Sequence, residues 1–350
     1  MIRERKYYLD ILRICSVCAV VLMHSAGFFQ DEVDPGSVLW LSAVLYSSIT
    51  RFAVPVFVMI SGALMLGRDT ICVKRLFSKS ILRLAAAYLF WAFIYTLVFS
   101  FFGYYEGKIT TLSVKNLISG TLTGGYFHLW YMPMIIGLYV LSPVLKAFLS
   151  GADRDTMKYW LTAGFVICFC IPVVMNVGII GEMFGESVEL FSNNAWGVYV
   201  FYFILGYLLD QLDDVPLRPG ILCVLGVAGG LISVLGTAAL SVRTGVFQRT
   251  LIDNNALPIL AISVALFVIV KRRCDRNWIP KHPQIIKRLS QYAFGVYLVH
   301  ELVLVAIYPY IVDRIPEICS IPVLFLVGML ISYLLVWGID RVKPVAKYII

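Results

Sequence analysis

Long runs of apolar residues recur along the chain, separated by short polar and charged stretches. Because an apolar run of about 20 residues is typical of a transmembrane helix, the pattern predicts about ten such helices. The first run lacks a small-residue cleavage site, so a retained helix is predicted there and not a removed signal peptide. The runs lie at 8–29, 39–66, 81–103, 128–149, 157–179, 195–212, 219–241, 252–270, 290–310 and 319–338. The expected fold class is therefore all-α, a polytopic transmembrane helix bundle.

Three polar residues lie inside the first apolar run, where a polar side chain is costly unless it faces protein or water. On a helix with about 100° per residue, Arg13 and His24 come within roughly 20° of the same face, about 16 Å apart along the axis. Asp10 falls within about 40° of the same line. The spacing predicts a polar seam through an apolar helix, which indicates a functional site.

The composition narrows the class of protein. Hydrophobic residues make up 60% of the chain and charged residues 14%, whereas a soluble globular domain has shares nearer one half and one quarter. A water-soluble globular domain is therefore excluded. No linker, low-complexity run or obvious internal repeat interrupts the chain, so residues 1–350 are predicted to form a single membrane domain.

Positive charge is distributed unevenly between the two sides of the predicted bundle. With the N-terminus in the cytoplasm, 23 of the 29 Lys and Arg residues fall on the inner side, in agreement with the positive-inside rule. Both termini are therefore predicted to be cytoplasmic, in a multi-pass protein of the cell (plasma or inner) membrane. The net charge of +8 follows from this topology and needs no nucleic-acid partner, although the inner basic loops could also bind a phosphorylated ligand.

Histidine is scarce, and three of the four histidines lie in or at the edge of predicted spans. His24 is expected in the outer half of the first helix, His128 at an outer boundary, and His300, beside Glu301, near mid-membrane. A buried histidine can act as a general base, but each of these could equally make a structural hydrogen bond. Neighbours on a helix diverge by about 100°, so His300 and Glu301 are not expected to point at one small site. No spacing of His and Cys indicates a metal site.

Other polar positions have both a structural and a functional interpretation. Ser61, which a glycine follows, is best explained by close helix packing through small residues. Trp130 and Tyr131 fit an aromatic belt at the membrane boundary as well as the wall of a substrate entrance. Lys79 and Arg83 lie where the third helix leaves the cytoplasm, so they fit both positive-inside topology and phosphate binding.

Several short motifs follow one another in a distinctive order. The first is Arg13, ten further residues and His24; the others are Phe57-Val-Met-Ile-Ser61-Gly62, Phe127–Met132, Phe201–Tyr207 and Ser290–His300. Together they resemble the acyltransferase 3 family of integral membrane acyltransferases, in particular its surface-polysaccharide O-acetyltransferases. Each motif is weak alone, whereas the ordered set is fairly specific and covers most of the chain.

The chain departs from this family at the entry to helix three. Family members often have Arg-x-x-Arg there, whereas this chain has Ser80 three positions before Arg83, and Lys79 one position earlier. A shift of one residue rotates Lys79 by about 100° relative to the family's first arginine.

The resemblance implies an acyl-CoA-dependent O-acyltransferase that moves an acyl group other than aminoacyl. The expected donor is acetyl-CoA or another acyl-CoA from the cytoplasm, and the expected acceptor is a hydroxyl of a cell-surface glycan or its lipid-linked precursor; the bilayer surrounds the protein, and no metal is expected. This assigns catalysis to His24 and Arg13, donor binding to Arg13, Lys79 and Arg83, acceptor binding to His128, Trp130 and Tyr131, and support to Asp10, Ser61, His300 and Glu301.

Two mechanisms and two other functions stay open. His24 could activate the acceptor hydroxyl as a general base, or carry the acyl group itself. The oxyanion could be stabilised by Ser61, Trp130 or Tyr131. The main alternative function is a small-solute transporter or permease-like membrane domain, because domains resembling this family can be fused to enzymes of amino-acid metabolism. A catalytically inactive scaffold for glycan assembly is the third.

Overall fold

The computed structural model describes residues 5–30, 33–105, 113–175, 195–213, 215, 217–274, 278–312 and 314–350. Within these ranges the regular secondary structure is helical, without strands. The elements are α1 (Tyr7–Gly27), α2 (Val38–Thr50), α3 (Ala53–Leu66), α4 (Val73–Arg75), η1 (Leu76–Ile81), α5 (Leu82–Tyr105), α6 (Val114–Leu122), η2 (Phe127–Trp130), α7 (Tyr131–Gly151), α8 (Arg154–Phe165), η3 (Val166–Cys170), α9 (Ile171–Met175), α11 (Ala195–Gln211), α12 (Pro219–Leu231), η4 (Ile232–Gly236), α13 (Thr237–Thr244), α14 (Leu257–Arg273), α15 (Pro283–Ile311), α16 (Glu317–Asp340) and α17 (Lys343–Ile349).

Eight helices in the described part of the chain are long and apolar enough to cross a membrane, and each coincides with a predicted run. They are Tyr7–Gly27, Val38–Leu66, Val73–Gly103, Phe127–Gly151, Arg154–Val174, Pro219–Thr244, Pro283–Ile311 and Glu317–Asp340. The other two predicted runs correspond to α11 and α14, which have 17 residues each. The prediction of an all-helical, multi-pass bundle is confirmed. Ten spans with both termini in the cytoplasm stay a prediction.

The predicted span at 252–270 is not one helix from end to end. Its first residues belong to a loop, 245–256, and α14 starts only at Leu257, with a proline in its first turn. The loop enters the bundle, since Ile252 is fully buried. Asn254 donates from Nδ2 to the Tyr199 hydroxyl at 2.8 Å, and its carbonyl oxygen accepts from the Tyr202 hydroxyl at 3.0 Å. Irregular backbone at membrane depth is stable where protein groups satisfy it in this way.

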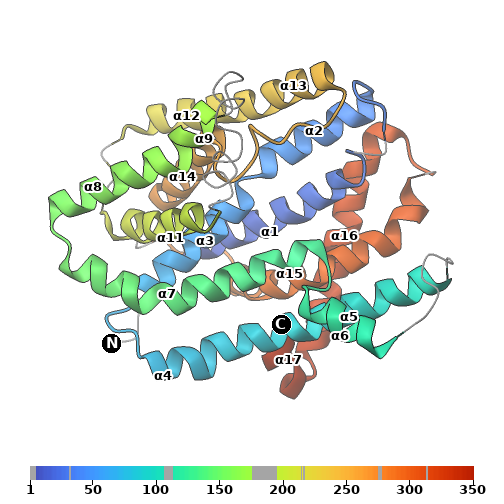
Figure 1. Cartoon of the computed structure of the whole chain (residues 1–350), viewed down its shortest axis with the longest axis horizontal. Coiled ribbons are helices and arrows are strands. Elements are labelled where there is room, and N and C mark those ends of the chain that lie inside the picture. The colour runs from blue at the N-terminus through green and yellow to red at the C-terminus, as the bar shows by residue number, and fades with distance from the viewer. Residues whose placement is uncertain are drawn as a thin grey trace.

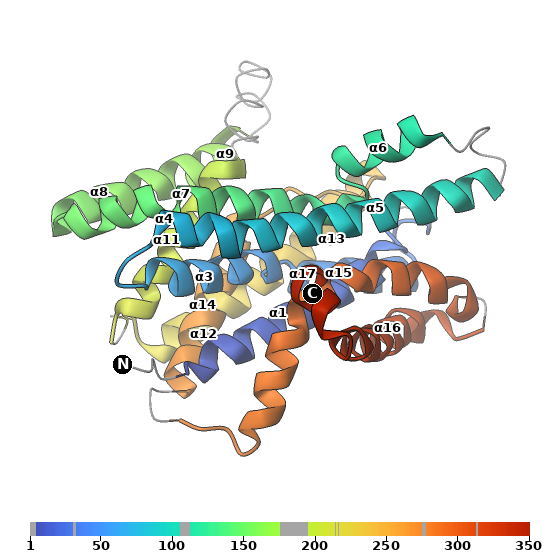
Figure 2. The same cartoon turned by 90° about the horizontal axis from the view of Figure 1, so that it is seen from below.

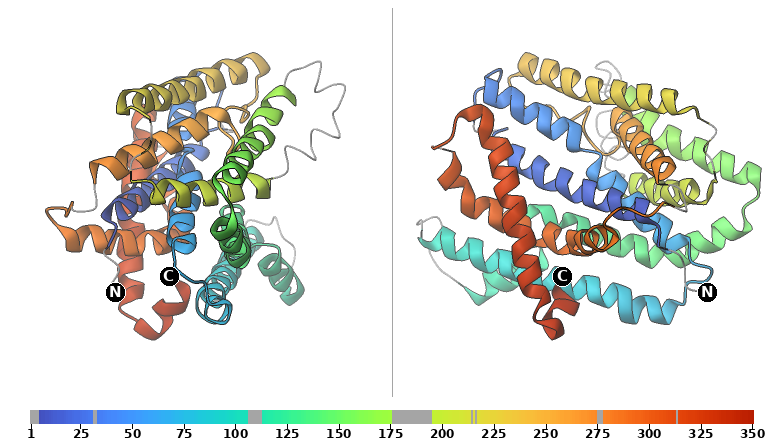
Figure 3. Two further views of the ribbon diagram at one scale, coloured as in Figure 1. Left: turned by 90° about the vertical axis from the view of Figure 1, so that its left-hand side faces the viewer. Right: turned by 180° about the vertical axis from the view of Figure 1, so that it is seen from behind.

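Helix α1 lies at the centre of the bundle. Figure 1 shows it between α5 along the lower edge and α12 with α13 along the upper edge. It packs against α15, α2, α3 and α16, and the end-on view in Figure 3 shows these helices around it. Polar side chains of α1 therefore face protein, as the apolar pattern around them predicts.

Close packing joins α3 to α11 through two glycines. A Cβ atom at Gly62 would lie 2.6 Å from the carbonyl carbon of Phe203 and closer still to its oxygen. A Cβ atom at Gly206 would likewise overlap the backbone of Met59. The packing interpretation of the Ser-Gly motif is therefore correct for its glycine, because only residues without a side chain allow this approach.

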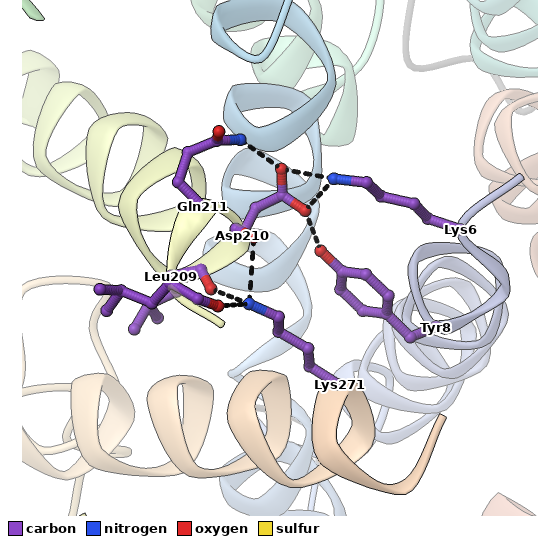
Figure 4. A network of polar contacts seen from close by, with 7 residues as sticks. Lys6, Tyr8, Leu209, Asp210, Gln211 and Lys271 are labelled. Carbon is purple, nitrogen blue, oxygen red and sulfur yellow. Dashed lines mark hydrogen bonds and ion pairs between the residues drawn. The ribbon is translucent and has the colours of Figure 1, made fainter. Parts of the chain in front are cut away.

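A polar network fixes the first turn of α1 to the ends of α11 and α14 (Figure 4). Lys6 Nζ lies 2.6 Å from the buried carboxylate of Asp210, which also accepts hydrogen bonds from the Tyr8 hydroxyl and from Gln211. Lys271 donates to the carbonyl oxygens that end α11, including that of Asp210 at 3.0 Å. Lys271 thus provides partners for helix-terminal carbonyl oxygens that would otherwise lack them. Lys6 and Tyr8 connect α1 to Asp210, so the network fixes the start of α1 relative to the end of α11.

The C-terminal residues pack on α5. Figure 2 shows α17 close to α5 and α15, and α17 contacts α5. Trp91 Nε1 donates to the carbonyl oxygen of Ile349, and Arg83 Nη2 donates to that of Ile350, both at 2.7 Å. Arg83 is thus held at the same end of the bundle as the start of α1.

Candidate active site

One cavity of about 1070 Å³ extends through the middle of the bundle. At the end near the start of α1, which we call the inner end, it is lined by an inner cluster of cations. Towards the other end it is lined by a histidine pair and by two further arginines, which we call the outer pair. The inner cluster is Arg13, Arg68, Lys79 and Arg83; the histidines are His24 and His128; the outer pair is Arg51 and Arg249.

Two of the three polar residues of the α1 seam, Arg13 and His24, line this cavity, as their spacing predicts. Two side chains outside the cavity lining orient Arg13. Its Nη1 donates to Ser290 Oγ at 2.9 Å and lies 3.5 Å from Asp10 Oδ1. Ser290 donates to the same Asp10 oxygen at 2.7 Å, and Arg5 pairs with the other oxygen at 2.7 Å. Asp10 is buried outside the cavity lining, so it supports Arg13 and does not face the cavity itself.

Lys79 and Arg83 both reach the cavity despite the departure from the family's motif. They are four residues apart on one continuous helical segment, and residues at this spacing share a face. Lys79 lies in the π-helical turn η1, where the chain makes wider turns than in an α-helix. The rotation expected for Lys79 therefore does not remove it from the site.

Three of the four histidines form a cluster at the end of α1. The ring centroid of His24 lies 5.1 Å from that of His300 and 6.3 Å from that of His128. His128 and His300 are 5.3 Å apart. His128 is buried and does not lie at an exposed mouth, and its carbonyl oxygen accepts from the Tyr297 hydroxyl at 2.7 Å. The cluster joins α1, η2 and α15, which no local sequence pattern connects.

The expectation that His300 and Glu301 cannot share one small site is wrong. His24 Nδ1 lies 3.6 Å from Glu301 Oε2, and the same oxygen lies 3.8 Å from His300 Nε2. Helix α15 is continuous there, so no distortion is needed. The side chains of His300 and Glu301 instead both extend to His24, so the three groups meet although His300 and Glu301 are neighbours on α15.

The tautomer of His300 follows from its surroundings. Its Nδ1 lies 2.7 Å from the carbonyl oxygen of Tyr297, and a carbonyl only accepts, so Nδ1 carries the hydrogen. His300 Nε2 then presents a lone pair towards Glu301 Oε2, and neither atom has a hydrogen-bond partner among the described residues. Facing lone pairs repel, so a proton held by Glu301 or by His24 stabilises the group.

The same group is also the place where a metal ion could bind. One ligand atom each from His24, His300 and Glu301 lies within 4.8 Å of the others. Imidazole and carboxylate are common ligands of transition metals. The absence of a metal, expected from the sequence, stays a prediction.

The other predicted site residues line the cavity between its two ends. Trp130 is 43% exposed and packs on the Tyr199 ring at 5.6 Å, while Tyr131 packs on Tyr297 at 5.5 Å. Ser61 lies within reach of the Tyr131 hydroxyl. All three predicted residues can therefore contact a molecule in the cavity.

Sequence reasoning missed part of the lining. Arg68 joins the inner cluster, and Gln30, Asn254 and the outer pair line the other end. Arg51 could have been predicted from the sequence, because a charged residue inside an apolar run indicates a functional position. Arg249 could not, because it belongs to a loop whose entry into the bundle depends on tertiary packing.

In its described part the chain is an all-helical bundle with eight helices long and apolar enough to cross a membrane and a cavity with charged residues in its lining, which indicates a multi-pass membrane protein. The chain belongs to the acyltransferase 3 family, because the family's acyltransferase domain matches residues 6–337. This membership indicates a membrane acyltransferase.

Comparison with curated proteins finds a distant relative, an "Amino-acid racemase" of Enterococcus faecalis, 24% identical over 353 residues. The match covers 95% of this chain and 46% of the relative, so the chain spans less than half the length of that protein. No solved structure matches the chain.

Proposed function

We propose that this protein is an O-acyltransferase of the cell membrane that takes an acyl group, acetyl in the simplest case, from a cytoplasmic acyl-CoA. The acceptor is a hydroxyl of a cell-surface glycan or of its lipid-linked precursor. The observation that carries the proposal is the single cavity that joins the cationic inner cluster to the His24 group. Such a cavity lets a donor enter from one side while the reaction takes place deep in the bundle.

The dimensions of the cavity suit a long, anionic donor. Arg13 and His24 are separated by about 16 Å along α1, the length of an extended chain of several bonds. The four cations of the inner cluster can bind the phosphate groups of coenzyme A, for which Arg and Lys are the usual partners. The acyl-bearing arm would then extend along the seam and bring the thioester to His24.

The chemistry at His24 has two balanced forms. In the first, His24 removes the proton of the acceptor hydroxyl, the oxygen attacks the thioester carbonyl, and the coenzyme A thiolate leaves and takes up a proton. In the second, a ring nitrogen of His24 attacks the thioester, and the departing coenzyme A thiolate takes up the ring proton. The acceptor hydroxyl then attacks the acyl-imidazole and takes the acyl group, and its proton returns to the ring. Glu301 acts as a positioning residue in both, because its carboxylate can hold the His24 Nδ1 proton.

Labelled acetyl-CoA incubated with the purified protein in detergent tests the proposal. We expect release of coenzyme A and, with a hydroxyl acceptor present, transfer of the label to it. If neither acetyl-CoA nor longer acyl-CoA donors are bound or cleaved, while a soluble acyl-CoA enzyme works in the same detergent, acyl-CoA dependence is refuted. Label that stays on the protein supports the carrier form.

Replacing Lys79 and Arg83 together by glutamine is expected to raise the KM for acetyl-CoA about 10- to 100-fold, because each charge-assisted phosphate contact is worth about 1.5–3 kcal/mol before solvent screening. We expect kcat to change much less, since neither side chain reaches the His24 group. Steady-state kinetics at several salt concentrations would measure both constants.

Lys74→Gln is the matched control for this pair. Lys74 lies one turn before η1, is exposed and is absent from the cavity lining. Its replacement removes the same charge at the same end of the bundle and should leave the KM unchanged. An equal rise of KM in Lys74→Gln would show that general surface charge, and not the cavity, attracts the donor.

Replacing Glu301 by glutamine is expected to lower kcat about 10- to 100-fold with the KM for acetyl-CoA unchanged, because the amide cannot stabilise a protonated His24. Glu301→Asp should recover part of the loss. A change of KM and kcat together, or equal losses in both variants, would instead indicate a packing role. Activity that vanishes with a chelator and returns with zinc would assign the carboxylate to a metal.

A second candidate function, transport of a small polar solute, is favoured by the interruption of the second span. Helix α2 ends at Thr50 and α3 begins at Ala53, and broken helices beside a central cavity are typical of secondary transporters. The racemase name of the distant relative is consistent with a solute related to amino acids. Gradient-driven uptake of serine or alanine into proteoliposomes without acyl-CoA would support transport, and absence of such flux would count against it.

A further inference from the structure

Two arginines face the outer part of the cavity without a partner. Neither Arg51 nor Arg249 makes a side-chain hydrogen bond or ion pair with any residue that the structure describes, although both line the cavity. The donor-binding proposal does not use them, because it involves the opposite end of the cavity. Their position therefore needs an explanation of its own.

Arg51 occupies the break between α2 and α3, in the middle of a 29-residue apolar segment. Its Nε is buried without a partner. A guanidinium at this depth is costly unless an anion neutralises it. The backbone keeps right-handed helical angles at Arg51 and Phe52, so the break is a local turn within one apolar segment, and Arg51 lines the cavity from it.

Arg249 is carried by the loop 245–256, which enters the bundle from the outer end. Phe247 packs edge-on against the buried ring of Trp40 at 6.5 Å, and Ile252 and Asn254 fix the other end of the loop as described above. Both flanks of Arg249 are thus anchored. A loop held in this way restrains the backbone of Arg249, whose exposed side chain lines the cavity.

Arg51 and Arg249 line the outer part of the same cavity, and like charges there repel each other. The acidic neighbour of the pair among the described residues is Asp253, whose backbone N–H donates to the carbonyl oxygen of Arg249 at 3.0 Å. One carboxylate cannot neutralise two guanidinium groups. Glu301, the carboxylate that lines the cavity in the described part of the chain, lies against His24. Among the residues that the structure describes, the outer end of the cavity therefore keeps an excess of positive charge.

We propose that Arg51 and Arg249 bind an oxyanion, a phosphate or a carboxylate, on the molecule that receives the acyl group. The acceptor is then an acidic hydroxyl compound, such as a phosphorylated polyol or a uronic acid unit, and not a neutral sugar. The identification of the bound molecule as the acyl acceptor rests on the proposed acyl transfer. The anion site itself stands on the two arginines.

The chemistry of the guanidinium group explains how such a site would prefer an anionic acceptor to a neutral one. Its planar fork binds two oxygens of one phosphate or carboxylate group at once, which fixes direction as well as distance. An anion held between Arg51 and Arg249 would leave a neighbouring hydroxyl of the same molecule directed at His24. A neutral acceptor would leave the buried Nε of Arg51 without an anionic partner, which disfavours its binding.

Competing acceptors in matched pairs test this inference. Purified wild-type protein and labelled acetyl-CoA would be incubated with sn-glycerol 3-phosphate against glycerol, and with glucuronate against glucose. We expect kcat/KM to favour the anionic member of at least one pair about 10- to 100-fold. The pair that shows the preference tells a phosphate site from a carboxylate site. Equal use of anionic and neutral members would overturn the proposal.

Arg51→Gln and Arg249→Gln should each remove this preference by lowering kcat/KM for the anionic acceptor alone. Arg243→Gln is the matched control, because Arg243 is exposed at the end of α13 and outside the cavity lining. A loss for neutral acceptors as well, or the same loss in Arg243→Gln, would mean that the arginines serve folding or general charge.

Ligand binding measured without catalysis keeps the test independent of the proposed function. Glucuronate and inorganic phosphate should raise the thermal unfolding temperature of the wild type, and Arg51→Gln and Arg249→Gln should abolish that shift for at least one of them. A shift that survives in both variants but is lost in Lys79→Gln would report the inner cluster and refute an outer anion site. Outer binding without His24-dependent cleavage of acetyl-CoA would instead refute acyl transfer and leave the anion site in place.

Discussion

Replacing His24 by glutamine is expected to lower the rate of acyl transfer about 10²- to 10⁴-fold, because a general base or a covalent carrier accounts for a factor of that size. Glutamine keeps the length and polarity of the side chain but can neither accept the hydroxyl proton nor carry the acyl group. Donor binding should be retained, since the inner cluster lies about 16 Å away along α1. Release of coenzyme A from labelled acetyl-CoA, followed over time in wild type and variant, would measure the loss.

His282→Gln is the matched control for His24. His282 precedes α15, is exposed and lies outside the cavity lining, so its replacement should leave the rate unchanged. If His24→Gln binds acetyl-CoA and transfers the acyl group at the wild-type rate, the histidine cluster is structural. Loss of acetyl-CoA binding together with activity would point to a folding defect instead.

The two chemical forms differ in what His24→Gln does to the protein-bound label. In the carrier form, wild-type protein quenched in acid-free denaturant carries label, and the variant carries none. In the general-base form neither does, because the acyl group passes directly from the thioester to the acceptor.

The apolar pattern predicts the bundle well because a membrane span must be long, continuous and apolar. It placed a helix at every run, and it predicted that Arg13 and His24 face one cavity since both belong to a single helix. It failed at 252–270, where an apolar composition hides a loop that enters the bundle. Hydropathy reports burial, and the loop is buried by protein through Asn254 and Ile252.

The site was harder to predict than the fold, because it joins residues that are distant in the sequence. The pattern predicts correctly that His300 and Glu301 point in different directions from α15. It cannot predict that His24 of another helix contacts both. Arg249 is the clearest case: nothing near it in the sequence distinguishes it from an ordinary outer-loop arginine. Its anchored loop and its unpartnered charge appear only in the folded bundle.

The site also depends on a contact far from any reactive group, the approach of α3 to α11. Helix α3 carries Phe57 and Ser61 on the cavity wall, and Arg51 lies just before its first residue. A shift of α3 by one methyl diameter would therefore move both Arg51 and the wall opposite His24. Stability and activity are coupled here through backbone packing.

Replacing Gly62 by alanine is expected to destabilise the protein by about 1–3 kcal/mol or more, because the new methyl group would overlap the carbonyl of Phe203 and a backbone carbonyl cannot move aside. The helices must separate, which leaves their packed surfaces incompletely filled. Thermal unfolding in detergent, followed by loss of the monodisperse peak on size-exclusion chromatography, would measure the change. We expect acyl transfer to fall at temperatures where the variant is still folded, since the cavity wall moves with α3.

Gly230→Ala provides the control, because Gly230 lies inside α12 and a Cβ atom there meets no other atom within 4 Å. Alanine has a more favourable helix propensity than glycine by about 0.5–1 kcal/mol, so this variant should be as stable as the wild type or slightly more stable. Equal stability of the two alanine variants would show that α3 and α11 are not packed as closely as the structure has them. A drop in Gly62→Ala alone would establish that the close approach of α3 to α11 at Gly62 supports the wall of the cavity.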